Sequence, residues 1–193
     1  VTVLTGVVSV AAGLDTSFAI LADGSVRSWG ADAYGQLGTG GTATGTCGFP
    51  NFIGPARCAN TPQVVPGLTG IARISAGDFQ VLAMKADGSL FAWGSNEWGI
   101  LLTGAAGPPQ LSPVAVTTIG PVTAIYAGSV YSEALAADGR VFFAGSYITT
   151  ILPAPTVFFA ADLFPPAFIA EPAASAFGAP YESNAITAAG IPA

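Results

Sequence analysis

The chain alternates short apolar runs with glycine-rich turns, and its clearest unit lies between Gly13 and Gly38. Within this unit two apolar runs of strand length, 17–21 and 26–29, flank the dipeptide Asp23-Gly24. An Asp-Gly dipeptide supplies the positive φ angles that a two-residue hairpin turn requires. The pattern therefore predicts two antiparallel strands followed by a loop punctuated by glycines.

The same unit recurs further along the chain. Residues 71–102 repeat its glycines, its Asp-Gly step and its Trp-Gly step at a displacement of 64 residues. Residues 122–146 repeat the glycines and the Asp-Gly step after 51 more, without the tryptophan. A fainter fourth copy lies in 178–193, where Ala189 replaces the turn aspartate. The additional 13 residues between the first two copies fall in 39–66, which we expect to be a loop inserted in a period of about 51 residues.

A period near 50 residues with several short strands per copy is typical of a β-propeller blade. A helical repeat of this length would need sustained 3.6-residue periodicity, which the density of Gly and Pro forbids. We therefore predict an all-β protein of propeller blades, with about three clear repeats and a degenerate fourth in an incomplete ring. We expect residues 1–147 to form the propeller-repeat region. Within it, residues 1–12 are expected to be the closing strand of a preceding repeat. Residues 148–193 form either a degenerate repeat or an arm between subunits.

Three stretches resemble the repeats of the regulator of chromosome condensation family: AAGLDTSFAILADGSVRSWGADAYGQLG, SAGDFQVLAMKADGSLFAWGSNEWG and YAGSVYSEALAADGRVFFAGS. The resemblance covers about 1–145 and implies blades of a seven-bladed β-propeller. Where the family often has histidine, this chain has Thr16, Gln80 and Tyr131, and Ala144 replaces the tryptophan of the third copy. The nucleotide-exchange activity of eukaryotic members is therefore not carried over. Secreted bacterial members, such as a propeller-type inhibitor of β-lactamase, fit the composition better.

Seven blades of this period would need about 350 residues, roughly twice the length of the chain. Three explanations stay open: the chain is a fragment, a protomer of a ring or fibre that other copies close, or an incompletely read sequence. An open end leaves strand edges and blade faces uncovered, which favours pairing with another chain.

Composition narrows the function classes. Only 8% of the residues are charged, the net charge is −6, and the five basic residues are scattered, whereas nucleic-acid binding needs clustered Lys and Arg. The chain has no histidine, no paired nucleophile and base, and no phosphate-binding glycine motif. We expect neither an enzyme nor a cofactor nor a metal site. No run of 18 apolar residues predicts a membrane helix.

The two cysteines, Cys47 and Cys58, lie 11 residues apart in a segment rich in Gly and Pro. This separation is wide for a zinc knuckle, and no further ligand pair completes a metal site. The sequence therefore favours a disulfide and an oxidising compartment, so we expect an extracellular or cell-surface protein. A first residue Val1 in place of Met predicts a processed or truncated N-terminus.

Four residues are candidates for contacts with a partner. Tyr34 and Trp98 occupy equivalent loop positions, flanked by Asp32 and Glu97 respectively. Large aromatic side chains on loops of a rigid scaffold are common recognition devices, but packing against the neighbouring blade is the alternative for both. We expect Trp29 and Trp93, which end the second hairpin strand, to pack blades together.

These observations lead to one main functional hypothesis. The chain is expected to be an extracellular structural or adhesive protein that acts through contacts between chains, with copies of itself as partners, in a surface assembly or filament. The alternative is a secreted protein-binding module or inhibitor that uses its loop aromatics. An enzyme that uses the propeller face would require an activity dependent on Glu97 or Asp32.

Overall fold

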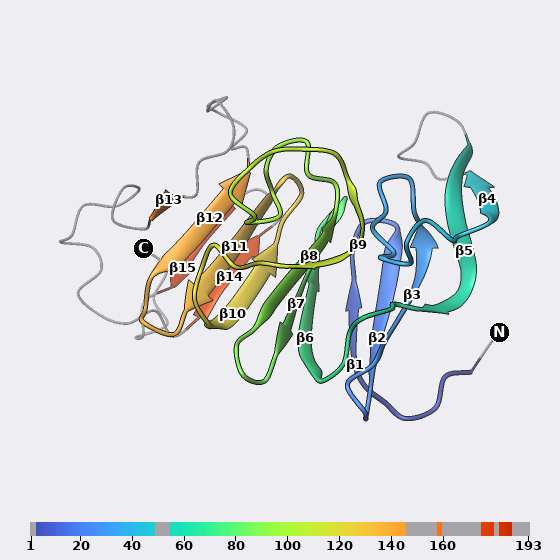
Figure 1. The fold of residues 1–193 in the computed structure, drawn as a ribbon, viewed down its shortest axis with the longest axis horizontal. Helices are drawn as coiled ribbons and strands as arrows, with labels where there is room; N and C mark the ends of the chain where they lie inside the picture. The colour runs from blue at the N-terminus through green and yellow to red at the C-terminus, as the bar shows by residue number, and fades with distance from the viewer. Residues whose placement is uncertain (1–2, 49–54, 146–157, 160–174, 180–181, 187–193) are drawn as a thin grey trace.

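The computed structural model describes residues 3–48, 55–145, 158–159, 175–179 and 182–186, and every regular element in these ranges is a β-strand. Figure 1 shows three sheets that stand side by side in chain order, which we call blades one, two and three. A two-stranded sheet lies against the third blade. The sheets do not close on one another. The predicted all-β fold with an unclosed set of propeller blades is confirmed.

Blade one is an antiparallel sheet with the strand order β1-β2-β3-β5-β4. Its strands are β1 (Val7–Ala12), β2 (Thr16–Leu21), β3 (Val26–Ala31), β4 (Gly45–Gly48) and β5 (Pro55–Val64). Two expectations are corrected here. Strand β1 pairs with β2, so it is the first strand of blade one and not the closing strand of a preceding unit. Strand β5 pairs with β3, so much of the expected 39–66 loop is the fourth strand of this blade.

The residues inserted in blade one form a hairpin at its outer edge. Strand β4 pairs with the first residues of β5, from Gly45 opposite Cys58 to Gly48 opposite Pro55. The predicted disulfide joins Cys47 to Cys58 across this hairpin, with a Cα–Cα distance of 5.9 Å. Beyond the hairpin the register is that of the next blade, because Gly30 faces Ala59 as Gly94 faces Gln110. The insertion thus extends the sheet without changing how β5 completes the blade.

Blades two and three each have four strands in sequential order. Blade two consists of β6 (Ile71–Ala76), β7 (Gln80–Lys85), β8 (Leu90–Gly94) and β9 (Gln110–Ala115). Blade three consists of β10 (Val122–Ala127), β11 (Tyr131–Ala136), β12 (Val141–Gly145) and β13 (Phe158–Phe159). The hairpin of β14 (Ser175–Ala179) and β15 (Glu182–Ile186) lies where the faint fourth copy was expected. The expected boundary between 147 and 148 lies outside the described residues.

The Asp-Gly steps form hairpin turns, as predicted, but not two-residue turns with positive φ angles at both positions. The Gly24 N–H donates to the Leu21 carbonyl at 2.8 Å and the Leu21 N–H to the Ser25 carbonyl at 2.9 Å, so the loop has three residues and its aspartate has no positive φ.

The glycines of the three Asp-Gly steps have positive φ angles of 73°, 83° and 86° at Gly24, Gly88 and Gly139. Each preceding aspartate accepts a hydrogen bond from the backbone N–H two residues further on, at 2.9–3.1 Å. Hydrogen bonds from Ser25, Ser89 and Arg140 lower the pKa values of these three carboxyl groups. The aspartates therefore act as turn residues, as the sequence indicates.

The blades touch through a row of glycines, Gly13, Gly77 and Gly128, one from the first strand-to-strand turn of each blade. A Cβ atom at Gly13 would lie 2.3 Å from the carbonyl oxygen of Gly77, and one at Gly77 would lie 2.1 Å from that of Gly128. Both separations are too short for any side chain. Next to the row, Gln80 Nε2 donates to the carbonyl oxygens of Gly128 at 2.9 Å and Tyr131 at 2.8 Å. The residue in the family's histidine position thus ties blade two to blade three.

Apolar side chains fill the spaces between the blades. The cluster between blades one and two is formed by Phe18, Ile20, Val26, Val65, Leu68, Ile71, Val81, Ala83 and Trp93, with Ala11, Ile74, Ala76 and Phe91 packed against it. A second cluster, which includes Leu82, Met84, Leu102, Phe142 and Ala144, lies between blades two and three. The hydrophobic core is therefore divided into layers between sheets, as expected for blades that cannot cover their own faces.

Trp93 is the largest side chain buried between blades one and two, with an exposed fraction of 0%. Its ring meets Phe18 edge-on at a centroid distance of 6.2 Å. Its Nε1 donates to the carbonyl oxygen of Gln36 at 2.9 Å, and a Cβ atom at Gly38 would lie 2.7 Å from that nitrogen. We call the backbone of 36–38 the glycine socket. The prediction that Trp93 packs two blades together is confirmed.

We expect Gly77→Ala to lower the free energy of unfolding by about 2–3 kcal/mol, because the new methyl group would collide with the backbone of Gly128. Gly120→Ala is the matched control, since no atom lies within 4 Å of the Cβ position there. Urea denaturation of both variants measures the difference. Equal stability of the two variants would show that the blades do not depend on this close approach.

Candidate functional site

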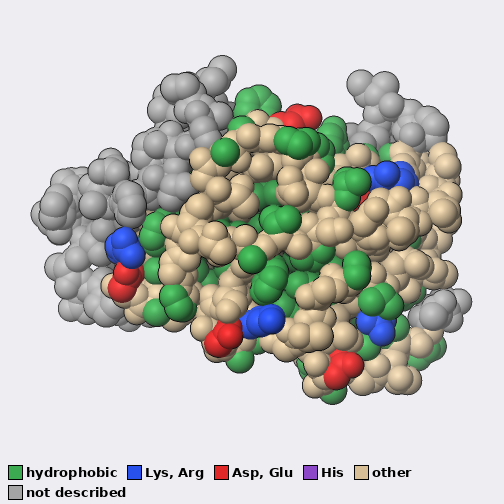
Figure 2. All heavy atoms as spheres, in the orientation of Figure 1, with side chains coloured by type: hydrophobic (Ala, Val, Ile, Leu, Met, Phe, Trp, Pro, Cys, Tyr) green, Lys and Arg blue, Asp and Glu red, His purple; other side chains and the backbone are tan. Residues whose placement is uncertain are grey.

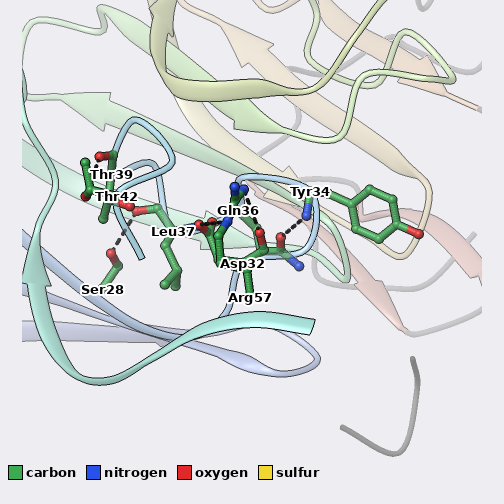
Figure 3. Close-up of polar contacts among 8 residues, drawn as sticks. All are labelled: Ser28, Asp32, Tyr34, Gln36, Leu37, Thr39, Thr42 and Arg57. Carbon is green, nitrogen blue, oxygen red and sulfur yellow. Dashed lines mark hydrogen bonds and ion pairs between the residues drawn. The ribbon is translucent and has the colours of Figure 1, made fainter. Parts of the chain in front are cut away.

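The loop that follows β3 carries a polar network around Asp32 (Figure 3). The Asp32 carboxylate accepts hydrogen bonds from the Leu37 N–H at 3.1 Å and from Arg57 Nε at 3.0 Å. Arg57 also donates to the backbone carbonyl of Asp32 at 3.0 Å. The Asp32 side chain has an exposed fraction of 0%, against 36% for Arg57. Asp32 therefore holds the loop beneath the surface and cannot contact a partner directly, which corrects its predicted role.

Further hydrogen bonds fix the same loop from both sides. Ser28 Oγ donates to the Leu37 carbonyl at 2.8 Å, and Thr42 Oγ1 donates to the Thr39 carbonyl at 2.9 Å. Burial raises the pKa of the Asp32 carboxyl group, while the Leu37 N–H and Arg57 act in the opposite direction. The network positions the glycine socket that receives Trp93. The loop therefore contributes to the contact between blades one and two.

Tyr34 extends from the same loop toward blade two. Its backbone N–H donates to Gln36 Oε1 at 2.7 Å, and Figure 3 shows its ring pointing away from the polar network. The ring meets Phe79 edge-on at a centroid distance of 5.1 Å. The structure thus favours the packing alternative for Tyr34, because the half-buried ring contacts Phe79 of blade two.

The equivalent loop of blade two differs at the tip. Asn96 takes the place of Asp32: it accepts from the Leu101 N–H at 3.3 Å and donates to the Ala105 carbonyl at 3.0 Å. Trp98 takes the place of Tyr34, but Val130 stands where Phe79 would be expected on the next blade. Trp98 is 49% exposed, and Glu97 beside it is also exposed. Of the four predicted contact residues, only Glu97 and Trp98 lie together at the surface.

A second surface lies on the side of blade one that faces away from blade two. We call it the open face, and it consists of Val10, Ala12, Arg27 and Trp29. The counterparts of these residues on blade two, displaced by 64 residues, are Ile74, Ala76, Phe91 and Trp93, all of which pack between blades one and two. On blade one Val10 is 73% exposed and Trp29 is half-buried. The sequence predicts an uncovered blade face at an open end but does not say which residues form it; the displacement of 64 residues identifies them once the packing of blade two is known.

Other kinds of site find little support in the described part of the chain. It contains no group of three or more side chains suited to hold a metal ion. No helix that could span a membrane occurs among the described residues. Figure 2 shows charged side chains in separate small spots on a mostly uncharged face, without a large basic patch. The candidate sites are therefore the open face of blade one and the tip formed by Glu97 and Trp98.

We expect Arg57→Gln to lower the free energy of unfolding by about 1–3 kcal/mol at neutral pH, since it leaves a buried carboxylate without its cation. The loss should shrink as the pH is lowered through the raised pKa of Asp32, because the protonated carboxyl group carries no charge. Asp32→Asn is the control and should change stability little, because Asn96 has the same role in blade two. Urea denaturation of both variants as a function of pH tests this; a loss independent of pH would contradict it.

Comparison with known proteins identifies the repeats. Two profiles described as the regulator of chromosome condensation (RCC1) repeat match residues 7–36 and 23–84. The chain is similar to the human probable E3 ubiquitin-protein ligase HERC6, with 33% identity over 141 residues, which are 71% of the chain and 12% of that protein. It is also similar to the mouse regulator of chromosome condensation, with 29% identity over 65% of the chain and 28% of that protein.

Solved structures agree with this result at the level of the fold. Prp20p from Saccharomyces cerevisiae superposes on the chain with a TM-score of 0.63 and 20% sequence identity, over 80% of the chain and 37% of Prp20p. The chain thus spans well under half the length of each of these proteins. The matches lie in the repeats, and the blades described above have the geometry of such repeats. The chain is therefore a member of the regulator of chromosome condensation repeat family, built from β-propeller blades.

Proposed function

We propose that the chain is an extracellular structural or adhesive protein that binds other protein chains through the open face of blade one. The observation that carries this proposal is that Val10 is exposed and Trp29 only half-buried, at positions that are covered on blade two. Burial of an aliphatic or aromatic side chain contributes about 1.5–3 kcal/mol, so covering this face would favour association.

Two further observations support the proposal. The disulfide between Cys47 and Cys58 fits an oxidising compartment, as outside the cell. A relative with the same fold, Prp20p, is described by its binding to Gsp1p and histones, so proteins are among the partners of such propellers. Ligase activity is not part of the proposal, because the chain matches 12% of HERC6 and the profile matches on this chain are RCC1 repeats.

Site-specific photocrosslinking in cells that produce the protein tests the proposal. A photoreactive amino acid at position 10 should give crosslinks to another protein chain in the extracellular or cell-surface fraction. The same group at Leu111, which is 39% exposed on β9 of blade two and so lies outside the open face, is the matched control and should give far fewer. Equal crosslinking at both positions, or crosslinks only inside the cell, would contradict the proposal.

The second candidate function is a secreted binding module or inhibitor that contacts its target through Glu97 and Trp98. The exposure of Trp98, at a position where Tyr34 is packed on blade two, favours this candidate. A photoreactive group at position 98 should then crosslink to the target, and Glu97→Gln should weaken the capture. Tyr34→Phe is the control that should leave the crosslinking unchanged. Absence of crosslinks at position 98 would rule this candidate out.

A further inference from the structure

We propose that the open face of blade one pairs with an RCC1-type blade that carries a free glycine socket, and not with a described blade of a second copy of this chain. This inference rests on the proposed function and specifies the partner. It follows from how the tryptophan at the end of the third strand is accommodated at each contact between blades.

At the contact of blades one and two, the tryptophan needs a glycine opposite it. Gly38 has a φ of +70°, and a Cβ atom there would lie 2.7, 3.0 and 3.1 Å from three atoms of the Trp93 indole. No side chain fits into those distances. The socket also supplies the Gln36 carbonyl oxygen as acceptor for the indole N–H. Shape and hydrogen bonding therefore both select tryptophan on one blade and glycine on the other.

At the contact of blades two and three, both the glycine and the tryptophan are replaced by other residues. Leu102 stands in the place of Gly38 and keeps the positive φ of that position, at 59°. Ala144 stands in the place of Trp93. Leu102 and Ala144 are 0% and 2% exposed in the same apolar cluster. A large side chain from the loop thus fills the space that the missing tryptophan leaves, and the two blades still pack.

Because it carries Trp29, the open face corresponds to the tryptophan–glycine type of contact and not to the alanine–leucine type. Trp29 is the counterpart of Trp93, and no hydrogen bond or ring contact reaches its indole from any described residue. A partner blade must therefore leave space for the indole and offer it a carbonyl oxygen, as the backbone of 36–38 does for Trp93. A loop with leucine in the place of Gly38 would occupy that space.

The described blades of a second copy do not meet this requirement. The socket of blade one is filled by Trp93 of the same chain, and the corresponding loop of blade two carries Leu102. The partner is accordingly another RCC1-type blade with a free glycine socket. The expectation that copies of the chain pair with one another does not extend to these blades.

Chains extended at the N-terminus test the selection rule. The added segment is a further copy of 7–70, which brings a glycine socket, or of 71–121, which brings leucine, or of 71–121 with Leu102→Gly in the added copy. Each added segment replaces residues 1–6 and is joined directly to Val7, so that the repeats keep their natural spacing. Thermal unfolding is then compared with and without Trp29→Ala in the original blade one.

We expect the change in Tm caused by Trp29→Ala to have opposite signs in the glycine-bearing and leucine-bearing chains. With either glycine-bearing extension, Trp29→Ala should lower the Tm by about 6 °C or more, because it empties a filled socket. With the leucine-bearing extension, Trp29→Ala should raise the Tm, because alanine matches leucine as it does between blades two and three. The same decrease in all three extended chains would overturn the inference.

The experiment also separates this inference from the proposed function. Val10→Arg should destabilise the extended chains more than the original chain if the added blade covers the open face. If it does not, the open face does not bind a blade and this inference fails, whereas the proposed function is tested separately by the crosslinking at position 10. As a second measurement, Leu102→Gly and Ala144→Trp in the original chain should each lower the Tm and together restore most of the loss. No recovery in the double variant would overturn the selection rule alone.

Discussion

The architecture depends on how closely the backbones of neighbouring blades approach at the glycine row. With no side chain at Gly13 or Gly77, the carbonyl group of the next blade lies where a Cβ atom would otherwise be. This approach brings the faces of adjacent sheets near enough for their apolar side chains to fill the space between them. Each blade is too thin to cover its own faces, so the glycine row and the layered core are parts of one solution.

Beside the glycine row, different residues occupy equivalent positions in the successive contacts between blades. The blades still pack because a change on one blade is matched by a change in size on its neighbour. Gln80 donates two hydrogen bonds to blade three, whereas the hydroxyl group of Thr16, in the same position of blade one, has no partner among the described residues. Trp93 with Gly38 and Ala144 with Leu102 fill equivalent spaces with opposite partners. Departures from the repeat pattern that look like erosion in one copy are thus matched by changes in its neighbour.

The loops that follow β3 and β8 each contain residues that hold the loop in place and an aromatic residue whose exposure differs between the two blades. Asp32 and Asn96 hold their loops by accepting the same backbone hydrogen bond, and only Asp32 requires a cation, Arg57. The aromatic side chain two residues further on packs against Phe79 in blade one and is half exposed in blade two, where Val130 stands in the place of Phe79. The same loop position thus holds a packing residue in one blade and a surface residue in the next.

The repeat period, the hairpin turns and the disulfide could be predicted from the order of residues alone. Each depends on local backbone angles, such as the positive φ at Gly24, or on residues close together in the chain, such as Cys47 and Cys58. The pairing of Arg57 with Asp32 and of Trp93 with the glycine socket spans 25 and 57 residues, and no local pattern indicates it. Val10 and Ile74 are both aliphatic residues in equivalent strands, so their patterns look the same. The presence or absence of a neighbouring blade makes one of them surface and the other core, and that is a property of the assembled fold.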